Sequence, residues 1–291
     1  MLKSIYLIGL LLVCSVSKAE PFVDVHLHYN WDHQELVTPE EVIRILEKHG
    51  ITHAVVSSVP SLDAAILRRT GAKWIYPFFS PYITGLSRAN WFSDDRVLPQ
   101  ARKALASGEF FGIGEVHLYG GLGPRRDNKV FTGLLALAVE FDVPVLIHTE
   151  ASDHRYFLPI CRQYSKVRFL WAHAGSILGP EQVGNLLKQC PNVWVEMSAR
   201  DPWHYGSFLS DQDEVPANWL KLFSDYPERF MIGTDPVWNA HQSNRWYEAD
   251  EGWAHYDKFI GYHKRWSATL PEALRKKLQY QNGLRFLRLE E

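Results

Sequence analysis

Short apolar runs alternate with amphipathic segments along most of the chain. The runs predict strands, and the segments between them carry apolar residues at the three-to-four spacing that is typical of helices. The expected strands are residues 22–28, 51–59, 74–79, 110–118, 144–149, 167–173, 192–197 and 230–234. The expected helices include residues 96–107, 131–141, 155–164, 180–189 and 217–224.

The first helix has a clear start and stop in the sequence. Thr38 is a good capping residue, Pro39 fits the first helical position, and two acidic residues follow in the first turn. Gly50 is expected to end this helix.

Continuous apolar strands that alternate with helices predict a parallel sheet covered on both faces. Eight such units fit one (β/α)8 TIM barrel over residues 20–291. The connections from helix to strand are short, whereas residues 81–95, 119–129, 200–216 and 236–257 are long connections from strand to helix. An open doubly wound sheet is the alternative, but the first strand is followed by His28-Tyr29-Asn30-Trp31 rather than by a glycine-rich phosphate turn.

The first 19 residues have the features of a secretory signal peptide. A basic start precedes an apolar run, and Ser17-Lys18-Ala19 offers small residues for cleavage after Ala19. We therefore expect a periplasmic or secreted protein. An uncleaved anchor or a lipoprotein attached through Cys14 are the alternatives, although the apolar run is shorter than the ~20 residues that span a bilayer. Export permits a disulfide between Cys161 and Cys190, but two buried thiols fit the sequence equally well.

The composition is that of a globular protein, with 46% hydrophobic and 22% charged residues and a net charge of −2 at pH 7. A nucleic-acid partner is not expected, because such proteins normally carry a basic excess. After cleavage no stable membrane insertion is expected. The expected partner is a small-molecule substrate, and the sequence leaves open whether the chain is a monomer or a homo-oligomer.

Titratable residues stand at the ends of several expected strands. They are His26 and His28 in strand one, Glu115 and His117 in strand four, His148 in strand five, His173 in strand six and Asp235 after strand eight. A buried charge is costly unless it is paired or bound to a metal, and imidazole with carboxylate suits zinc and its neighbours. Strict strand alternation also places Asp24 on the face of His26 and His28, one step deeper, as a supporting carboxylate.

The ordered set His26-x-His28, Glu115, His148, His173 and Asp235 resembles the metal site of the amidohydrolase superfamily. The segment 270–287 is similar to the last helices of its amidohydrolase-related branch. The resemblance covers essentially the whole chain after the signal peptide. It implies that His26, His28 and Asp235 hold one divalent metal ion, most simply Zn²⁺, and that His148 and His173 hold or face a second.

In this superfamily the position of Glu115 is taken by a carbamylated lysine or a glutamate, so Glu115 favours two ions over one. Asp235 is the expected catalytic proton acceptor, and His173, if it is not a ligand, would hydrogen-bond the attacking water. Thr149 and Glu150 are candidates for orienting the imidazoles.

The long loops carry many tryptophans and arginines, which suit an anionic or ring-containing substrate. Arg200, Trp203, Trp238 and His117 are the candidate substrate-binding residues.

These features predict an exported metal-dependent hydrolase that cleaves an amide, ester, lactone or phosphoester. A metal-dependent decarboxylase on the same barrel is the closest alternative. A non-catalytic metal- or solute-binding barrel is the alternative from another class, and it would be expected to have lost a ligand.

Overall fold

The computed structural model describes residues 20–85, 87–119, 123–150, 152–237 and 248–289. The expected signal peptide and Trp238 lie outside these ranges. Within them, no helix is both long enough and apolar enough to cross a bilayer.

The structure confirms a (β/α)8 barrel. Eight strands pair in parallel with their sequence neighbours, in the order β1 to β8. Two backbone hydrogen bonds join the first strand to the last: Val25 N to Ile232 O at 3.2 Å and Asp235 N to His26 O at 2.9 Å. The strands are β1 (Phe22–His28), β2 (Ile51–Ser57), β3 (Ile75–Phe79), β4 (Gly112–Tyr119), β5 (Val145–Glu150), β6 (Phe169–Trp171), β7 (Val193–Glu196) and β8 (Phe230–Met231).

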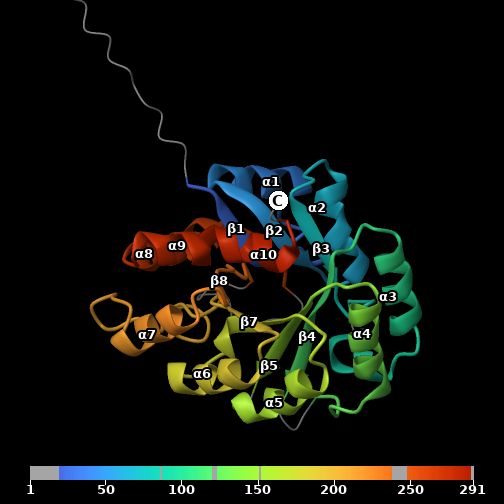
Figure 1. The fold of residues 1–291 in the computed structure, drawn as a ribbon. Coiled ribbons are helices and arrows are strands. Elements are labelled where there is room, and N and C mark those ends of the chain that lie inside the picture. The colour runs from blue at the N-terminus through green and yellow to red at the C-terminus, as the bar shows by residue number, and fades with distance from the viewer. Residues whose placement is uncertain (1–19, 86, 120–122, 151, 238–247, 290–291) are drawn as a thin grey trace, which may run out of the picture.

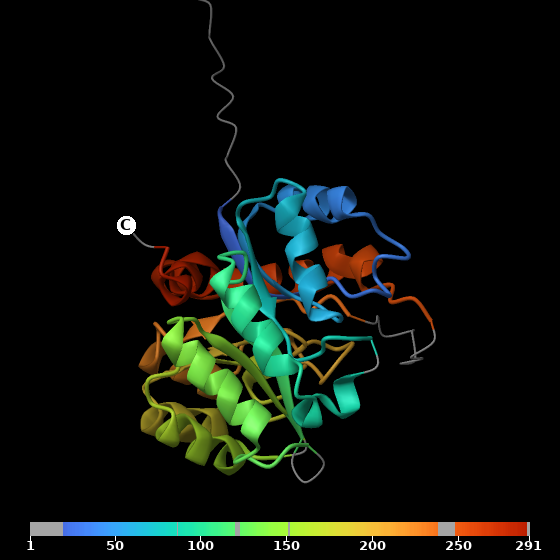
Figure 2. The ribbon, with the colours of Figure 1, turned by 90° about the vertical axis from the view of Figure 1, so that its right-hand side faces the viewer.

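The helices lie outside the strands, and the C-terminal helices lie beside β1 and β8 (Figures 1 and 2). They are α1 (Pro39–Lys48), α2 (Ala65–Arg69), α3 (Val97–Ala106), α4 (Lys129–Glu140), α5 (His154–Gln163), α6 (Pro180–Gln189), α7 (Ala217–Asp225), α8 (Tyr256–Ala268), α9 (Glu272–Lys276) and α10 (Asn282–Leu287). The expected cap of α1 is present: Thr38 Oγ1 accepts from Glu41 N at 3.3 Å, and Glu41 Oε2 accepts from Thr38 N at 2.8 Å.

Strands β6 and β8 are shorter than the sequence predicts, and the backbone takes an uncommon conformation at the site residue that follows each of them. His173 has φ 56° and Asp235 has φ 49°, both in the left-handed region. Such backbone is uncommon for residues other than glycine and clusters at functional sites. The early strand ends therefore turn these two side chains toward the barrel mouth.

The pairing of β1 with β2 contains an irregularity that changes one sequence-based expectation. Between Asp24 and Leu27 the first strand advances three residues while its partner advances two, which is a β-bulge. Asp24 does not share the face of the two histidines. Its carboxylate contacts Tyr256 of α8 and Thr234, whereas Val25 packs among residues of the inner apolar cluster. The strict period of two was therefore wrong here, because an extra residue moves Asp24 to the outer face.

A similar irregularity lies just before Glu115 in β4. Gly114 has φ +133°, and a Cβ at this position would collide with the carbonyl oxygen of Leu146. Only glycine fits this conformation and this close approach without strain. The irregularity aligns the strand end so that His117 stands opposite His148 of β5.

The two remaining cysteines form a disulfide. Cys161 in α5 is joined to Cys190 at the end of α6, with a Cα to Cα distance of 5.9 Å. The sequence left open whether these cysteines form a disulfide or remain two buried thiols, and the structure contains the disulfide. The bond ties together two neighbouring outer helices.

Candidate metal centre

Three side chains from the first and last strands converge at the barrel mouth. His26 Nε2 and His28 Nε2 lie 3.1 Å apart, and His28 Nε2 lies 3.3 Å from Asp235 Oδ1. All three residues are buried. The other ring nitrogen of His28, Nδ1, lies 3.0 Å from Ser57 Oγ, which fixes the ring so that Nε2 faces its neighbours. His26, His28 and Asp235 are thus arranged to hold one ion.

Glu115 lies between this group and two further histidines. Its Oε2 is 3.3 Å from His28 Nε2, and its Oε1 is 2.9 Å from His148 Nδ1 and 3.5 Å from His173 Nε2. Burial alone would raise the pKa of Glu115, but the surrounding imidazoles hold it well below the usual value. The carboxylate is therefore ionised and faces both halves of the cluster.

Glu196 of β7 supports the cluster from behind, and the sequence analysis missed it. It is fully buried, and its Oε1 lies 3.0 Å from His26 Nδ1 and accepts from His173 N at 2.7 Å. Its Oε2 accepts from Ser198 N at 2.6 Å, and Ser198 Oγ lies 2.9 Å from His173 Nδ1. Glu196 and Ser198 thereby orient both imidazoles with Nε2 toward the common centre. An acidic residue inside the apolar run 192–197 was the signal that could have found it.

The donor set fits a divalent cation. Asp235 Oδ1 is buried and has no hydrogen-bond partner among the described residues. The Nε2 atoms of His26 and His28 face each other at 3.1 Å, and each Nδ1 is directed at an outer partner, so that in the neutral rings with the proton on Nδ1 both Nε2 lone pairs face the centre. Burial opposes the charged form of His26, yet the charges of Asp235, Glu115 and Glu196 raise its pKa well above the usual value. The buried negative charge thus calls for a cation at this point.

His117 belongs to the same cluster but is set up differently. The backbone N of His117 donates to Tyr82 Oη at 2.9 Å, and this hydroxyl lies 2.6 Å from His117 Nδ1. Burial raises the pKa of Tyr82 well above its usual value, so the hydroxyl keeps its proton and donates a hydrogen bond to His117 Nδ1. The proton of the neutral ring is thereby assigned to Nε2, which lies 3.3 Å from Glu115 Oε2. In this tautomer His117 donates to Glu115 rather than offering a lone pair.

The cluster forms the inner wall of a cavity of about 390 Å³ at the carboxyl ends of the strands. Besides the ligand candidates, the described residues that line it include Tyr119 and Glu150 at the ends of β4 and β5, Arg88 in the connection after β3, and His204 and Tyr205 in the connection after β7. Tyr205 Oη lies 3.2 Å from His148 Nε2 and donates to Glu150 Oε1 at 3.3 Å. This cavity is the space in which a small molecule would meet the candidate ligands.

The profile of the amidohydrolase family matches residues 23–289, which is most of the chain. The chain belongs to the amidohydrolase family. Metal-dependent hydrolysis is the generic activity of this family. Among the curated proteins none matches.

Solved structures of other proteins share the fold at low identity. An amidohydrolase from Burkholderia multivorans with bound zinc is 14% identical, with a TM-score of 0.55, and the match covers 93% of this chain and 100% of that one. A TatD homologue from Escherichia coli is 13% identical, with a TM-score of 0.60 over 91% of this chain and 97% of that one. A dihydroxybenzoic acid decarboxylase from Polaromonas with bound manganese is 13% identical, with a TM-score of 0.55 over 93% and 98%.

Two of the four substrate-binding candidates do not line the cavity of this amidohydrolase. Arg200 is buried, and its guanidinium donates to the backbone oxygens of Ser176 at 2.5 Å and Leu178 at 2.9 Å. Trp203 packs edge-on against Phe259 of α8. Both side chains hold loops onto the barrel. His117 does line the cavity, and Trp238 lies outside the described residues.

Of the two residues expected to orient imidazoles, one lies at the site. Glu150 Oε2 is 3.7 Å from His148 Nε2. Thr149 instead accepts a hydrogen bond from Trp171 Nε1 at 2.8 Å. Thr149 therefore braces the wall between β5 and β6 rather than an imidazole.

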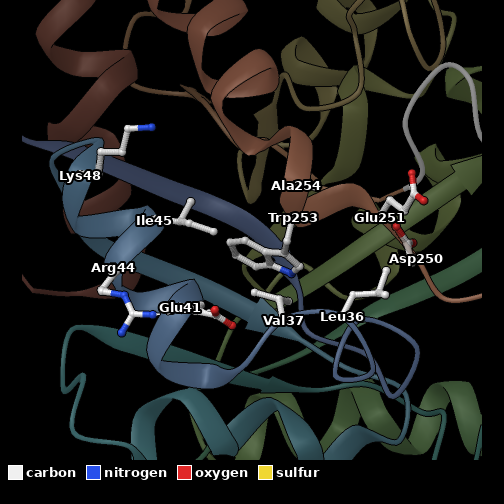
Figure 3. Close-up of a pocket in the computed structure, with 10 residues that line it drawn as sticks. All are labelled: Leu36, Val37, Glu41, Arg44, Ile45, Lys48, Asp250, Glu251, Trp253 and Ala254. Atoms are coloured by element: carbon white, nitrogen blue, oxygen red, sulfur yellow. Dashed lines mark ion pairs between the residues drawn. The ribbon is translucent and has the colours of Figure 1, made fainter.

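A second cavity of about 350 Å³ lies beside α1, away from the metal cluster. Figure 3 shows the Trp253 indole among the side chains of Ile45, Val37 and Leu36. Trp253 was one of the loop tryptophans expected near the substrate, but its Nε1 donates to the backbone oxygen of His28 at 2.9 Å. Its ring supports β1, the strand that carries His26 and His28, from the outside of the barrel.

Proposed function

We propose that this chain is an exported metal-dependent hydrolase that cleaves an amide, ester, lactone or phosphoester bond in a small substrate with an anionic group or a ring. The observation that carries the proposal is the convergence of His26, His28, Glu115 and Asp235 at the mouth of a cavity, with Asp235 Oδ1 buried and without a hydrogen-bond partner.

Asp235 is proposed as the proton acceptor. Its Oδ1 faces His28, and its Oδ2 lies 3.9 Å from His173 Nε2, so a water molecule between them would contact both side chains. A carboxylate in this position takes a proton from the attacking water and returns it to the leaving group. His173, held by Glu196 and Ser198, would orient the water when it does not serve as a ligand. A divalent cation bound here would supply Lewis acidity, which lowers the pKa of water and polarises the bond that is cleaved.

We propose two ions rather than one, and Zn²⁺ as the most suitable. His26, His28 and Asp235 form one donor group, and Glu115 faces both this group and His148. Nitrogen and carboxylate donors with few ligands suit zinc. The solved amidohydrolase with zinc and the solved dihydroxybenzoic acid decarboxylase with manganese share this fold, so more than one metal is compatible with it.

Elemental analysis of the purified protein tests the site. Near two equivalents of metal are expected, falling toward one in Glu115→Ala and in His148→Ala. A folded wild-type protein that holds no metal when loaded with Zn²⁺ or Mn²⁺ would overturn the proposal. Glu140→Ala, on the exposed face of α4, is the matched control for removal of a carboxylate.

The reaction type is tested by labelling. Hydrolysis of a panel of amides, lactones and phosphoesters in ¹⁸O-water incorporates one labelled oxygen into the product. A decarboxylase would instead release carbon dioxide from an aromatic acid. A metal-loaded protein that only releases carbon dioxide would replace hydrolysis by the decarboxylase alternative, and a protein that transforms no member of either panel would favour a binding barrel.

Export is supported by two features of this chain. The sequence 1–19 has the pattern of a cleaved signal, and Cys161 is disulfide-bonded to Cys190. Disulfides persist in oxidising compartments such as the periplasm and the extracellular space. Mass spectrometry of the mature protein is expected to find Glu20 as its first residue, and an intact amino terminus would contradict cleavage.

A further inference from the structure

We infer that Arg88 is the residue that selects a carboxylate-bearing substrate in this cavity; the inference rests on the proposed function. Arg88 lies in the connection between β3 and α3, on the face of the barrel that carries the metal cluster. Among the described residues that line the cavity, it is the side chain with a permanent positive charge. No ion pair joins it to any carboxylate in the described part of the chain.

The carboxylates that line the cavity with Arg88 face the imidazoles, and Asp235 lies 3.3 Å from His28 Nε2 and 3.9 Å from His173 Nε2. Glu115 faces five imidazoles, and Glu150 accepts from Tyr205 Oη and faces His148 Nε2. Glu150 is partly exposed, and its partners are His148 of β5 and Tyr205 of the connection after β7. The Arg88 guanidinium is thus free to pair with an anion that enters the cavity.

Arg88 shares the cavity with an aromatic side chain, Tyr119. Tyr119 lies at the end of β4, and its ring is stacked on that of His117 with centroids 5.8 Å apart. Burial is the main cause that raises the pKa of Tyr119, to about 12, and the charge of Arg88 acts in the opposite direction. Arg88 and the Tyr119 ring therefore lie near each other in the cavity that also holds the candidate ligands.

These three elements of one cavity, a cation, a ring and the candidate ligands, define a class of substrate. A ring packs against Tyr119, a carboxylate on the ring pairs with Arg88, and the bond to be cleaved points toward Asp235 and His28. Arginine pairs with a carboxylate through two parallel hydrogen bonds, which lysine cannot reproduce. Arg88 is a specificity residue because it contacts the substrate at a distance from the reacting bond.

The test compares two probes that differ in one charge. Binding of isophthalate and of 3-carbamoylbenzoate to the metal-loaded protein is measured by calorimetry. The wild type is expected to bind isophthalate about 10- to 100-fold more tightly, because its second carboxylate pairs with Arg88. In Arg88→Ala the two probes are expected to bind equally, with the affinity for 3-carbamoylbenzoate unchanged, and Arg88→Lys is expected to keep part of the difference.

Arg125→Ala is the control. Arg125 lies in the next connection, where it is exposed and paired with Asp127, so the preference for isophthalate should persist. A wild-type ratio near one, an absence of binding by both probes, or a ratio that survives in Arg88→Ala would overturn the inference. Metal content and hydrolysis are measured on the same samples. A wild-type protein that binds metal and hydrolyses its substrate but shows no preference for isophthalate contradicts this inference alone. A wild-type protein that neither binds metal nor hydrolyses any substrate contradicts the proposed function.

Discussion

Asp24 and Thr234 join the first strand of the barrel to the segment after the last. Asp24 Oδ1 accepts from the backbone N of Thr234 at 3.0 Å, and its Oδ2 accepts from Thr234 Oγ1 at 2.7 Å. The residue that follows Thr234 is Asp235, the proposed proton acceptor. The buried carboxylate therefore fixes the backbone on which Asp235 stands, from the side opposite to the cavity.

Replacing Thr234 by valine tests this relationship. The variant removes one donor to a buried carboxylate, so the free energy of unfolding is expected to fall by about 1 to 3 kcal/mol. The catalytic rate is expected to fall as well, because Asp235 loses its support. Denaturant unfolding measures the first effect. Thr70→Val is the control, since its hydroxyl donates to Ile66 O at the exposed end of α2, and an equal loss in both variants would contradict the special role of Thr234.

Glu196→Gln is expected to weaken metal binding while the fold persists. Glutamine keeps the size and the oxygen acceptor but lacks the charge that polarises His26. Loss of such an outer partner typically lowers metal affinity about 10- to 100-fold. Competition with a chelator gives the affinity, and Glu140→Gln on the surface of α4 serves for comparison. An unchanged metal affinity in Glu196→Gln would show that Glu196 does not support metal binding.

The pair of Asp201 and His204 predicts a pH dependence of stability. Burial lowers the pKa of His204, but the hydrogen bond and charge of Asp201 outweigh it and raise the pKa to about 9. Because the pKa of His204 is higher in the folded state than in the unfolded state, its protonation stabilises the fold fully below pH 6.5. This contribution is lost as the pH rises through about 9. The free energy of unfolding is therefore expected to decline between pH 6.5 and 9.

Asp201→Asn separates this effect from other titrations. The amide keeps one oxygen as an acceptor but removes the charge, so the His204 titration followed by NMR should move from about 9 back toward 6.5. A titration that stays near 9 in the variant would show that Asp201 is not its cause.

Reduction of the bond between Cys161 and Cys190 is expected to lower the free energy of unfolding by about 2 to 4 kcal/mol, because the cross-link restricts the unfolded chain. Unfolding with and without a reductant measures this. The Cys161→Ala, Cys190→Ala double variant should be insensitive to the reductant, and a wild type that is equally insensitive would argue against the bond.

The sequence by itself determined the order of strands and helices and the five strand ends that carry ligands. These features are local: apolar runs, caps and the position of a polar residue at the end of a strand depend on neighbours a few residues away. Thr38 and His26 could be assigned in this way, and the barrel followed because eight parallel units of this length have few other arrangements.

The tertiary structure decided which polar side chains meet. Glu196 and His26 are 170 residues apart in sequence, and their contact depends on the register of the whole barrel. A bulge of one residue places Asp24 on the outer face. Arg200 donates to backbone oxygens outside the cavity, whereas Arg88 lines the cavity. Such outcomes depend on long-range packing and on shifts of a single residue, so no local pattern could specify them.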